Sequence, residues 1–280
     1  MTDLTSTWQL FFPQLILGSL SGALLSLLGI LIVLRRMTFF GLTLSQGVSF
    51  SVAVCLFLQW TGEVWTILLS LLLTIPLVFV KNKVKNSEEV VLGIFFLFFS
   101  AISQFLLALG GNVQNHLMAS YFGDILTSQV KLNSLGVYAS LFALILYGFF
   151  FHRFLFISFD PEQYKIQKGN PLFFDLLYYG ILAVSITVAV NLFGSFFSMS
   201  HMIIPVFTLL PWISSLKKLA LAVVIFSIFG TLLGFYFSLF GFRWKGEEIF
   251  FPTSSTIILV LCFSSLMLFG LRKIMSLSQR

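Results

Sequence analysis

FFPQLILGSLSGALLSLLGILIVLRR, residues 11–36, carries no charged side chain before its last two positions, Arg35 and Arg36. A helix of about 20 apolar residues is long enough to cross the hydrocarbon core of a bilayer. The segment therefore predicts a transmembrane helix that ends at a basic turn. Gly18, Gly22 and Ser26 repeat at every fourth position, which places small residues on one helical face and predicts close packing against another helix.

The remainder of the 280-residue chain has the same character. Hydrophobic residues make up 58% of it and charged residues 9%, Phe occurs 36 times, and the mean hydropathy is +1.02. These values lie outside the range of water-soluble globular domains. We therefore expect one integral membrane domain over residues 1–280, surrounded by a lipid bilayer. The net charge of +6 then reports orientation in the membrane and not nucleic-acid binding.

Further long apolar runs follow the first, and short polar segments separate them. They cover residues 37–58, 64–80, 90–109, 135–151, 172–193, 194–213, 219–240 and 251–271. Lys and Arg residues mark cytoplasmic loops, and here they fall on one side of the crossings if the N-terminus is outside. We predict an all-α, polytopic helical bundle of about eight or nine transmembrane helices in the cell membrane, with a cytoplasmic C-terminus.

Motifs of common enzymes are missing from the sequence. It contains no Walker phosphate loop, no His-Glu-x-x-His pair and no Gly-x-Ser-x-Gly turn. The chain is therefore not expected to be an enzyme. A secondary transporter or channel that works without ATP is an alternative. Such proteins usually keep a charged residue inside a span for ion coupling, and none is clearly placed there in this sequence.

Five segments resemble, in order, the zinc/manganese permease family of bacterial ABC importers. They are Arg35–Gly41, Glu89–Ile94, Tyr121–Leu126, Ser158–Glu162 with the following Gly169, and Phe193–Pro205, which ends in Ile-Ile-Pro. Each motif is short, but together they extend over about residues 10–270 and lie on the predicted sides of the membrane. The resemblance implies a permease.

A permease of this family forms a homodimer or heterodimer, binds a separate ATPase, and receives zinc or manganese from an extracytoplasmic binding protein. The resemblance thus implies that ATP is bound by the partner subunit and that this chain holds no cofactor. It also implies that the segment with Asp160, Glu162, Tyr164 and Gly169 contacts the ATPase. A short helix there would present Glu162 and Tyr164 to the cytoplasm, and Gly169 would allow the chain to turn.

The second apolar run departs from the family pattern at two positions. The family has an Asp and a His, four residues apart on one helical face and suited to bind the passing cation, where this chain has Leu42 and Gln46. Neither replacement supplies a charge or an imidazole. A polar stripe of Ser45, Gln46 and Ser49 remains, because helical spacing puts these residues on one face. We assign the stripe to the substrate pathway, and hydrogen bonding between helices is the alternative.

His201 is the histidine inside a predicted span, at a place where the family usually has an aliphatic residue. One helical face of this Pro-broken segment carries Ser198, His201, Met202 and Pro205. Imidazole suits zinc, copper, iron and nickel, and the thioethers of Met199 and Met202 favour Cu(I). We predict a substrate pathway here with His201 as a metal ligand. The alternative is a hydrogen-bonded core histidine beside methionines that fill gaps.

The replacement of the Asp and His leaves the cargo open. The chain would carry another metal, carry a metal complex, or form a heterodimer in which a second permease chain supplies the ligands. A membrane scaffold that no longer transports is the remaining alternative.

Overall fold

The computed structural model describes residues 4–60, 62–83, 88–109, 135–167, 169–239, 242–244, 247–249 and 251–278. Its elements, in chain order, are α1 (Leu4–Leu34), α2 (Thr38–Phe57), α3 (Glu63–Lys83), α4 (Glu88–Leu109), α6 (Leu135–Phe159), α7 (Pro161–Ile166), α8 (Pro171–Phe193), α9 (Ser195–Leu209), α10 (Leu216–Ser238), β1 (Phe242–Trp244), β2 (Glu247–Ile249) and α11 (Thr253–Ser278). The Tyr121–Leu126 motif lies outside the described residues.

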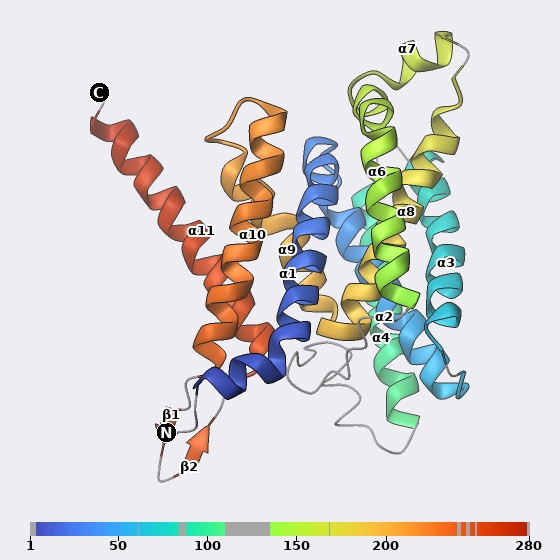
Figure 1. Cartoon of the computed structure of the whole chain (residues 1–280). Helices are drawn as coiled ribbons and strands as arrows, with labels where there is room; N and C mark the ends of the chain where they lie inside the picture. The colour runs from blue at the N-terminus through green and yellow to red at the C-terminus, as the bar shows by residue number, and fades with distance from the viewer. Residues whose placement is uncertain are drawn as a thin grey trace.

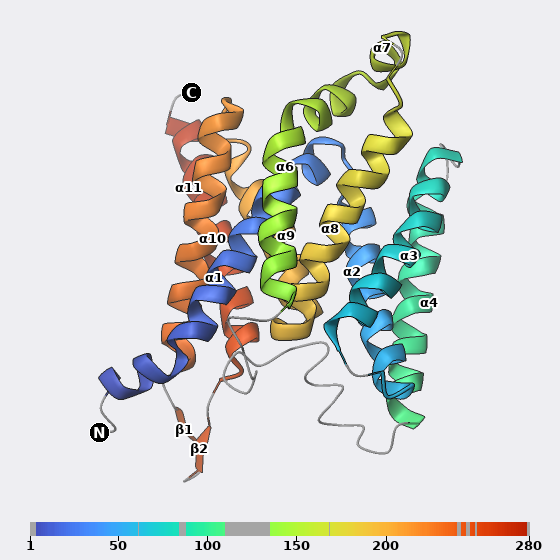
Figure 2. The same ribbon diagram turned by 45° about the vertical axis from the view of Figure 1, so that its right-hand side comes forward.

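Eight of these helices are long and apolar enough to cross a membrane. They stand roughly side by side, and successive helices alternate in direction except that α8 and α10 both run away from the α7 end (Figures 1 and 2). The short helix α7 protrudes at one end of the bundle, and the antiparallel strands β1 and β2 lie at the other end. We call these the α7 end and the hairpin end. The predicted all-helical membrane bundle is confirmed, and the small hairpin is an addition that the apolar runs did not predict.

The shorter helix α9 completes the path of the chain. It has 15 residues, which corresponds to about 22 Å of helix and is less than the roughly 30 Å of a hydrocarbon core. Gly194 joins α8 to α9 with φ of 84°, a conformation that glycine adopts without strain. Together with residues 210–215, α9 returns the chain to the α7 end, where α10 begins. The segment predicted as a ninth crossing, residues 194–213, thus contains a short helix with Pro205, and whether it spans the membrane or is re-entrant stays a prediction.

Helix α1 lies in the middle of the bundle and packs against α9, α10 and α8. Gly22 lies against the His201 ring, and a side chain on Gly29 would collide with the backbone of Met202. The Ser26 hydroxyl donates to the carbonyl of Val223 on α10 over 3.4 Å. The small-residue face of α1 therefore allows the close helix packing that its spacing predicts.

Helix α2 packs most extensively against α4. The Thr43 hydroxyl donates to the carbonyl of Leu92 over 3.1 Å, and the rings of Phe50 and Phe99 stack with centroids 5.6 Å apart. On its other sides α2 contacts α8 and α9. These contacts fix which face of α2 points toward α9.

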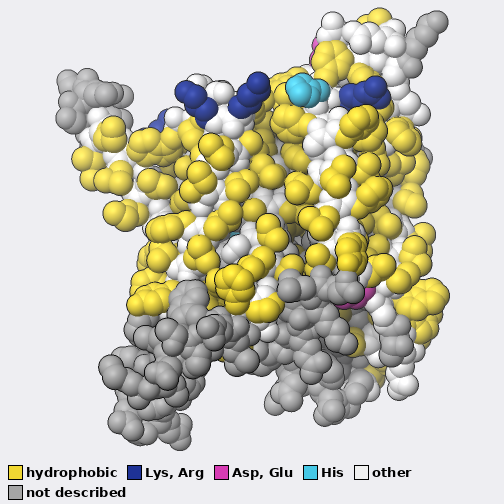
Figure 3. Space-filling view, viewed as in Figure 1, with side chains coloured by type: hydrophobic (Ala, Val, Ile, Leu, Met, Phe, Trp, Pro, Cys, Tyr) yellow, Lys and Arg dark blue, Asp and Glu magenta, His cyan; other side chains and the backbone are white. Residues whose placement is uncertain are grey.

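Hydrophobic side chains cover the middle of the face shown in Figure 3, and Lys, Arg and His side chains gather along its upper edge, at the α7 end. Many large apolar side chains are exposed there and elsewhere, for example Phe149 with 78% of its surface. An apolar girdle of this kind suits contact with lipid, and a basic edge suits the cytoplasmic interface.

Candidate functional site

A small polar cluster joins α2 and α9 inside the bundle. The hydroxyls of Ser45 and Ser198, which are 153 residues apart in the sequence, share a hydrogen bond of 2.7 Å. Ser45 also donates to the Ser195 carbonyl over 3.4 Å, and Ser49 donates to the Ser45 carbonyl over 3.2 Å. All of these side chains are buried. The structure therefore brings together two residues that were assigned to the same pathway from separate segments.

Two oxygens in this region have no hydrogen-bond partner among the described residues. They are Oε1 of Gln46, whose residue is only 2% exposed, and Oγ of Ser195, whose residue is fully buried. A buried polar atom without a partner costs about 1 to 3 kcal/mol. The α2 and α9 helices thus keep spare hydrogen-bond capacity at membrane depth.

His201, one turn after Ser198, points toward α10 and α1. Its Nδ1 lies 3.0 Å from the Phe197 carbonyl oxygen and its Nε2 lies 3.0 Å from Oγ1 of Thr231 on α10. A carbonyl only accepts hydrogen bonds, so a neutral ring donates from Nδ1 and leaves Nε2 as an acceptor facing the Thr231 hydroxyl, which also donates to the Ser227 carbonyl over 2.9 Å. The ring is fully buried, stacks 4.0 Å from Phe197 and lies against Gly22 of α1.

The position of Thr231 bears on the prediction that His201 is a metal ligand. A metal at Nε2 would have to displace the Thr231 hydroxyl, because its oxygen lies 3.0 Å from that nitrogen. The partners that the structure gives His201 lie on α9, α1 and α10, and not on α2, where Gln46 lies. The role of His201 as a metal ligand stays a prediction, and the present arrangement is that of a satisfied core histidine.

A groove of about 540 Å³ lies between α2, α9 and α11. Leu42 lines it, at the position where the resembled family has its Asp, and so does Met199. The complete lining is Leu42, Phe196, Met199, Ser200, Ile203, Ile204, Ser255, Ile258 and Leu259. This wall offers one thioether and two hydroxyls but no charged group. A bare divalent cation would therefore find no compensating charge among these lining residues.

Met202 and Pro205, which were also predicted to belong to the pathway, are buried in the contacts between helices. Met202 is fully buried and its side chain lies against Gly41 of α2, while Pro205 is buried within α9. The sequence did not point to Ser200 or to Ser255, although Ser255 belongs to a Thr-Ser-Ser-Thr stretch, residues 253–256, that opens an apolar run. That polar stretch could have indicated that α11 helps to line the groove.

The predicted ATPase-contact segment forms the protruding helix α7. Asp160 caps it by accepting the Gln163 amide over 2.8 Å, and Pro161 occupies its first turn, which explains why a helix begins here. Glu162 is exposed, as expected. Tyr164 instead packs partly buried against Phe156 and Phe174.

Two further residues, Gly169 and Ile166, shape the surface of α7 and of the turn that follows it. A side chain on Gly169 would collide with the Tyr164 ring, so this glycine makes room for the packed tyrosine. Ile166 is 81% exposed at the far end of the helix, although nothing in the sequence had singled it out. An exposed aliphatic side chain on a short protruding helix is suited to contact another protein.

Asp175 corrects the expectation that no charged residue lies inside a span. It belongs to the apolar part of α8 and pairs with Arg35, whose Nη1 lies 2.8 Å from its Oδ1. The pair is buried near the α7 end, and sequence inspection missed it because the partners are 140 residues apart.

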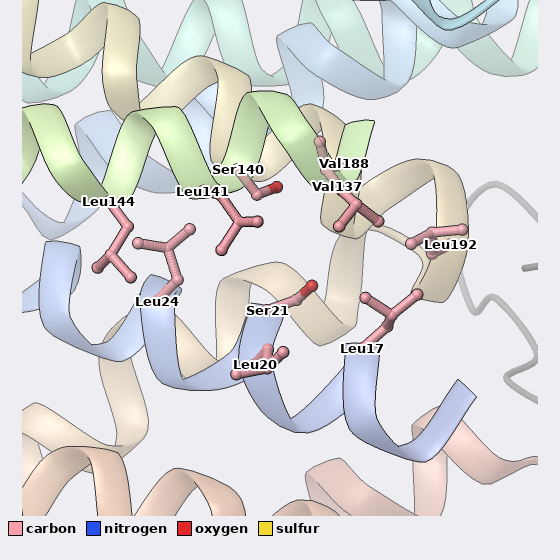
Figure 4. A pocket seen from close by; sticks show the side chains of 10 residues that line it. All are labelled: Leu17, Leu20, Ser21, Leu24, Val137, Ser140, Leu141, Leu144, Val188 and Leu192. Atoms are coloured by element: carbon pink, nitrogen blue, oxygen red, sulfur yellow. The ribbon is translucent and has the colours of Figure 1, made fainter. Parts of the chain in front are cut away.

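A smaller gap of about 60 Å³ lies between α1, α6 and α8. Figure 4 shows leucines of α1 and α6 pointing toward each other across it, with Ser21 and Ser140 as its hydroxyl-bearing residues. Its lining contains no charged side chain. Its size and lining are those of imperfect helix packing, and we assign it no function.

The bundle of spanning helices, the helix that protrudes from one end and the groove at membrane depth define a multi-pass membrane protein. Residues 7–272 match the ABC 3 transport family. The chain belongs to this family.

Named relatives are similar over most of their length. The high-affinity zinc uptake system membrane protein ZnuB of Haemophilus influenzae is 28% identical over 206 residues, which cover 72% of this chain and 77% of that protein. The manganese import system permease protein ScaB of Streptococcus gordonii is 24% identical over 249 residues, covering 89% and 87%. A chain in the structure of PsaBC from Streptococcus pneumoniae in complex with Fab superposes with a TM-score of 0.75 at 22% identity, covering 91% and 89%, and thus shares the fold.

Proposed function

We propose that this chain is the membrane-spanning subunit of an ABC importer that carries a transition metal, with zinc and manganese as the first candidates. Membership of the ABC 3 transport family over residues 7–272 carries the proposal, and the zinc and manganese systems among the relatives suggest the cargo. The partners would be a separate ATPase that binds ATP, an extracytoplasmic metal-binding protein and a second permease chain.

The orientation follows from charge. Basic side chains gather at the α7 end, which we therefore place in the cytoplasm, with the hairpin end and the N-terminus outside. In a bacterial cell this corresponds to the cytoplasmic membrane. The proposed cargo path follows α2 and α9, where the groove and the buried Ser45–Ser198 pair lie on neighbouring helices.

The neutral groove limits how a metal is held. In a homodimer, two copies of the groove would bring no charge together, so a bare cation needs ligands from elsewhere. A second, different permease chain would supply them, or the metal would arrive in a complex. A groove of about 540 Å³ lies within the usual size range of small-molecule sites and exceeds what a bare ion needs.

Reconstitution tests the proposed function. In proteoliposomes that contain the chain, its ATPase and its binding protein, we expect uptake of zinc or manganese that requires ATP and stops when the ATPase is inactivated. Uptake by the homodimer should be compared with uptake by a complex that includes a second permease chain. Equal metal uptake without any nucleotide would refute the importer and favour a secondary transporter.

The exposed surface of α7 provides a separate test. Ile166→Asp and Glu162→Lys are each expected to reduce copurification of the ATPase about tenfold, because a few exposed side chains usually dominate a protein interface. Gln59→Lys, which introduces a lysine at an exposed position of the hairpin end, should leave copurification unchanged. Unchanged copurification in both α7 variants would show that the ATPase docks elsewhere.

A further inference from the structure

Arg35, in the turn between α1 and α2, reaches across to two other helices. Its Nε donates to Oγ of Ser158 over 2.7 Å and its Nη1 donates to Oδ1 of Asp175 over 2.8 Å. Nη2 donates to the Phe154 carbonyl over 3.3 Å. The side chains of Arg35 and Asp175 are only 6% and 10% exposed. One guanidinium thus holds the end of α6 and the beginning of α8 to the turn before α2.

Two tyrosines of α8 complete this Arg35 clamp. The guanidinium carbon lies 5.0 Å from the ring centre of Tyr178 and 5.8 Å from that of Tyr179. The Tyr178 hydroxyl donates to the Leu28 carbonyl of α1 over 2.7 Å, and the Tyr179 hydroxyl donates to the Met37 sulfur over 3.1 Å. Burial lowers the pKa of Arg35, but Tyr179 and Asp175 raise it and prevail, so that the clamp remains charged.

The clamp contacts the two helices between which the protruding helix α7 lies in the chain. Helices α6 and α8 are the two arms that carry α7, as Figure 2 shows. Tyr164 of α7 packs between Phe156 of α6 and Phe174 of α8, with ring centres 5.9 and 5.8 Å away. A force on α7 is therefore transmitted to the parts of α6 and α8 that Arg35 binds.

The clamp also contacts the start of α2, which lines the groove. Phe40 of α2 lies 4.2 Å from the Tyr179 ring, and Leu42 of the groove follows within the same turn of α2. Contacts that are buried and charge-assisted resist separation, because an unpaired buried charge is costly. The arm that carries α7 and the start of α2 are thus joined more firmly than apolar packing alone would join them.

We propose that Arg35 is a positioning residue that makes the α6–α7–α8 arm and the start of α2 move as one body, so that a displacement of α7 by the ATPase reaches the groove. The inference rests on the proposed function and adds the path by which ATP hydrolysis is coupled to cargo movement. Rigid-body motion of this kind is a common mode of conformational switching.

The test compares coupling in reconstituted complexes, as cargo ions moved per ATP hydrolysed. Arg35→Gln and Asp175→Asn are expected to keep the ATPase bound and active while cargo per ATP falls at least about fivefold. Arg36→Gln, which removes the neighbouring exposed charge, should match the unmodified chain. Normal coupling in both clamp variants would overturn the proposal, whereas absence of ATP-driven uptake by the unmodified complex would overturn the proposed function itself.

The double variant Arg35→Gln/Asp175→Asn separates positioning from stability. It removes both charges of the Arg35–Asp175 pair, so its thermal stability should recover toward that of the unmodified chain. Coupling should remain low, and hydrogen exchange of α7 in the purified chain should remain faster than in Arg36→Gln. Recovery of coupling together with stability would assign Arg35 a purely structural role and contradict the proposal.

Discussion

A Gly29→Ala variant is expected to lose about 3 kcal/mol of stability, which is a large effect for one methyl group. A methyl group at this position would overlap the carbonyl oxygen and backbone of Met202, so α1 and α9 would have to move apart. Backbone atoms cannot yield as the end of a flexible side chain does. Thermal unfolding of the purified protein in detergent measures the change.

Gly148→Ala and Gly270→Ala are the matched controls. Both glycines lie in helices, and a methyl group there would meet no atom within 4 Å. Since alanine favours helix over glycine by up to about 1 kcal/mol, these variants should be neutral or slightly more stable. If all three variants behaved alike, the tight crossing of α1 and α9 would be wrong, and with it the position of the His201 ring against Gly22.

The lengths of the apolar runs and the basic residues at their ends were sufficient to predict most of the fold. Each predicted run corresponds to a helix, because a segment in lipid must satisfy its own backbone hydrogen bonds and a helix does so locally. The pathway prediction also placed Ser45 and Ser198 in one region, and they share a hydrogen bond. In both cases the relevant signal lies within one segment or in its polar residues.

The direction in which α9 presents its side chains could not be predicted in the same way. Residues on several sides of α9 itself are buried, among them Phe197, Met199, His201 and Val206. No single apolar stripe therefore marks the side that faces its neighbours. His201 and Met199 were therefore grouped in one site. In the structure the histidine contacts α1 and α10 while the methionine lines the groove.

Contacts between residues far apart in the sequence could not be predicted either. Asp175 follows Pro171 near the start of an apolar run and resembles an ordinary helix-start residue, so its burial becomes evident only when Arg35 is seen beside it. The contribution of α11 to the groove could not be predicted either, because a helix surface is apolar both where it contacts lipid and where it contacts another helix. A single sequence does not show which helices are adjacent.

Restoring the two ligands that the family usually has is expected to create a metal site in the groove. In a Leu42→Asp/Gln46→His variant, the carboxylate and the imidazole would lie four residues apart on one face of α2. Position 42 lines the groove, and Oε1 of Gln46 lacks a partner in the part of the chain that the structure describes. The carboxylate supplies the missing charge, so zinc affinity of the purified chain should rise tenfold or more, about 1.4 kcal/mol. Titration with zinc or manganese alone measures this affinity.

The Leu42→Asn/Gln46→His variant isolates the effect of charge. It has nearly the same shape as the double variant but no carboxylate, so it should gain little of the affinity. Binding by the Leu42→Asp/Gln46→His variant should also weaken as the pH falls below about 6.5, because a protonated imidazole cannot ligate a metal. If the unmodified chain already binds zinc as tightly as the double variant, its metal site does not depend on the neutral groove. The cargo would then be held elsewhere, and the buried histidine on the opposite face of α9 would become the first position to examine.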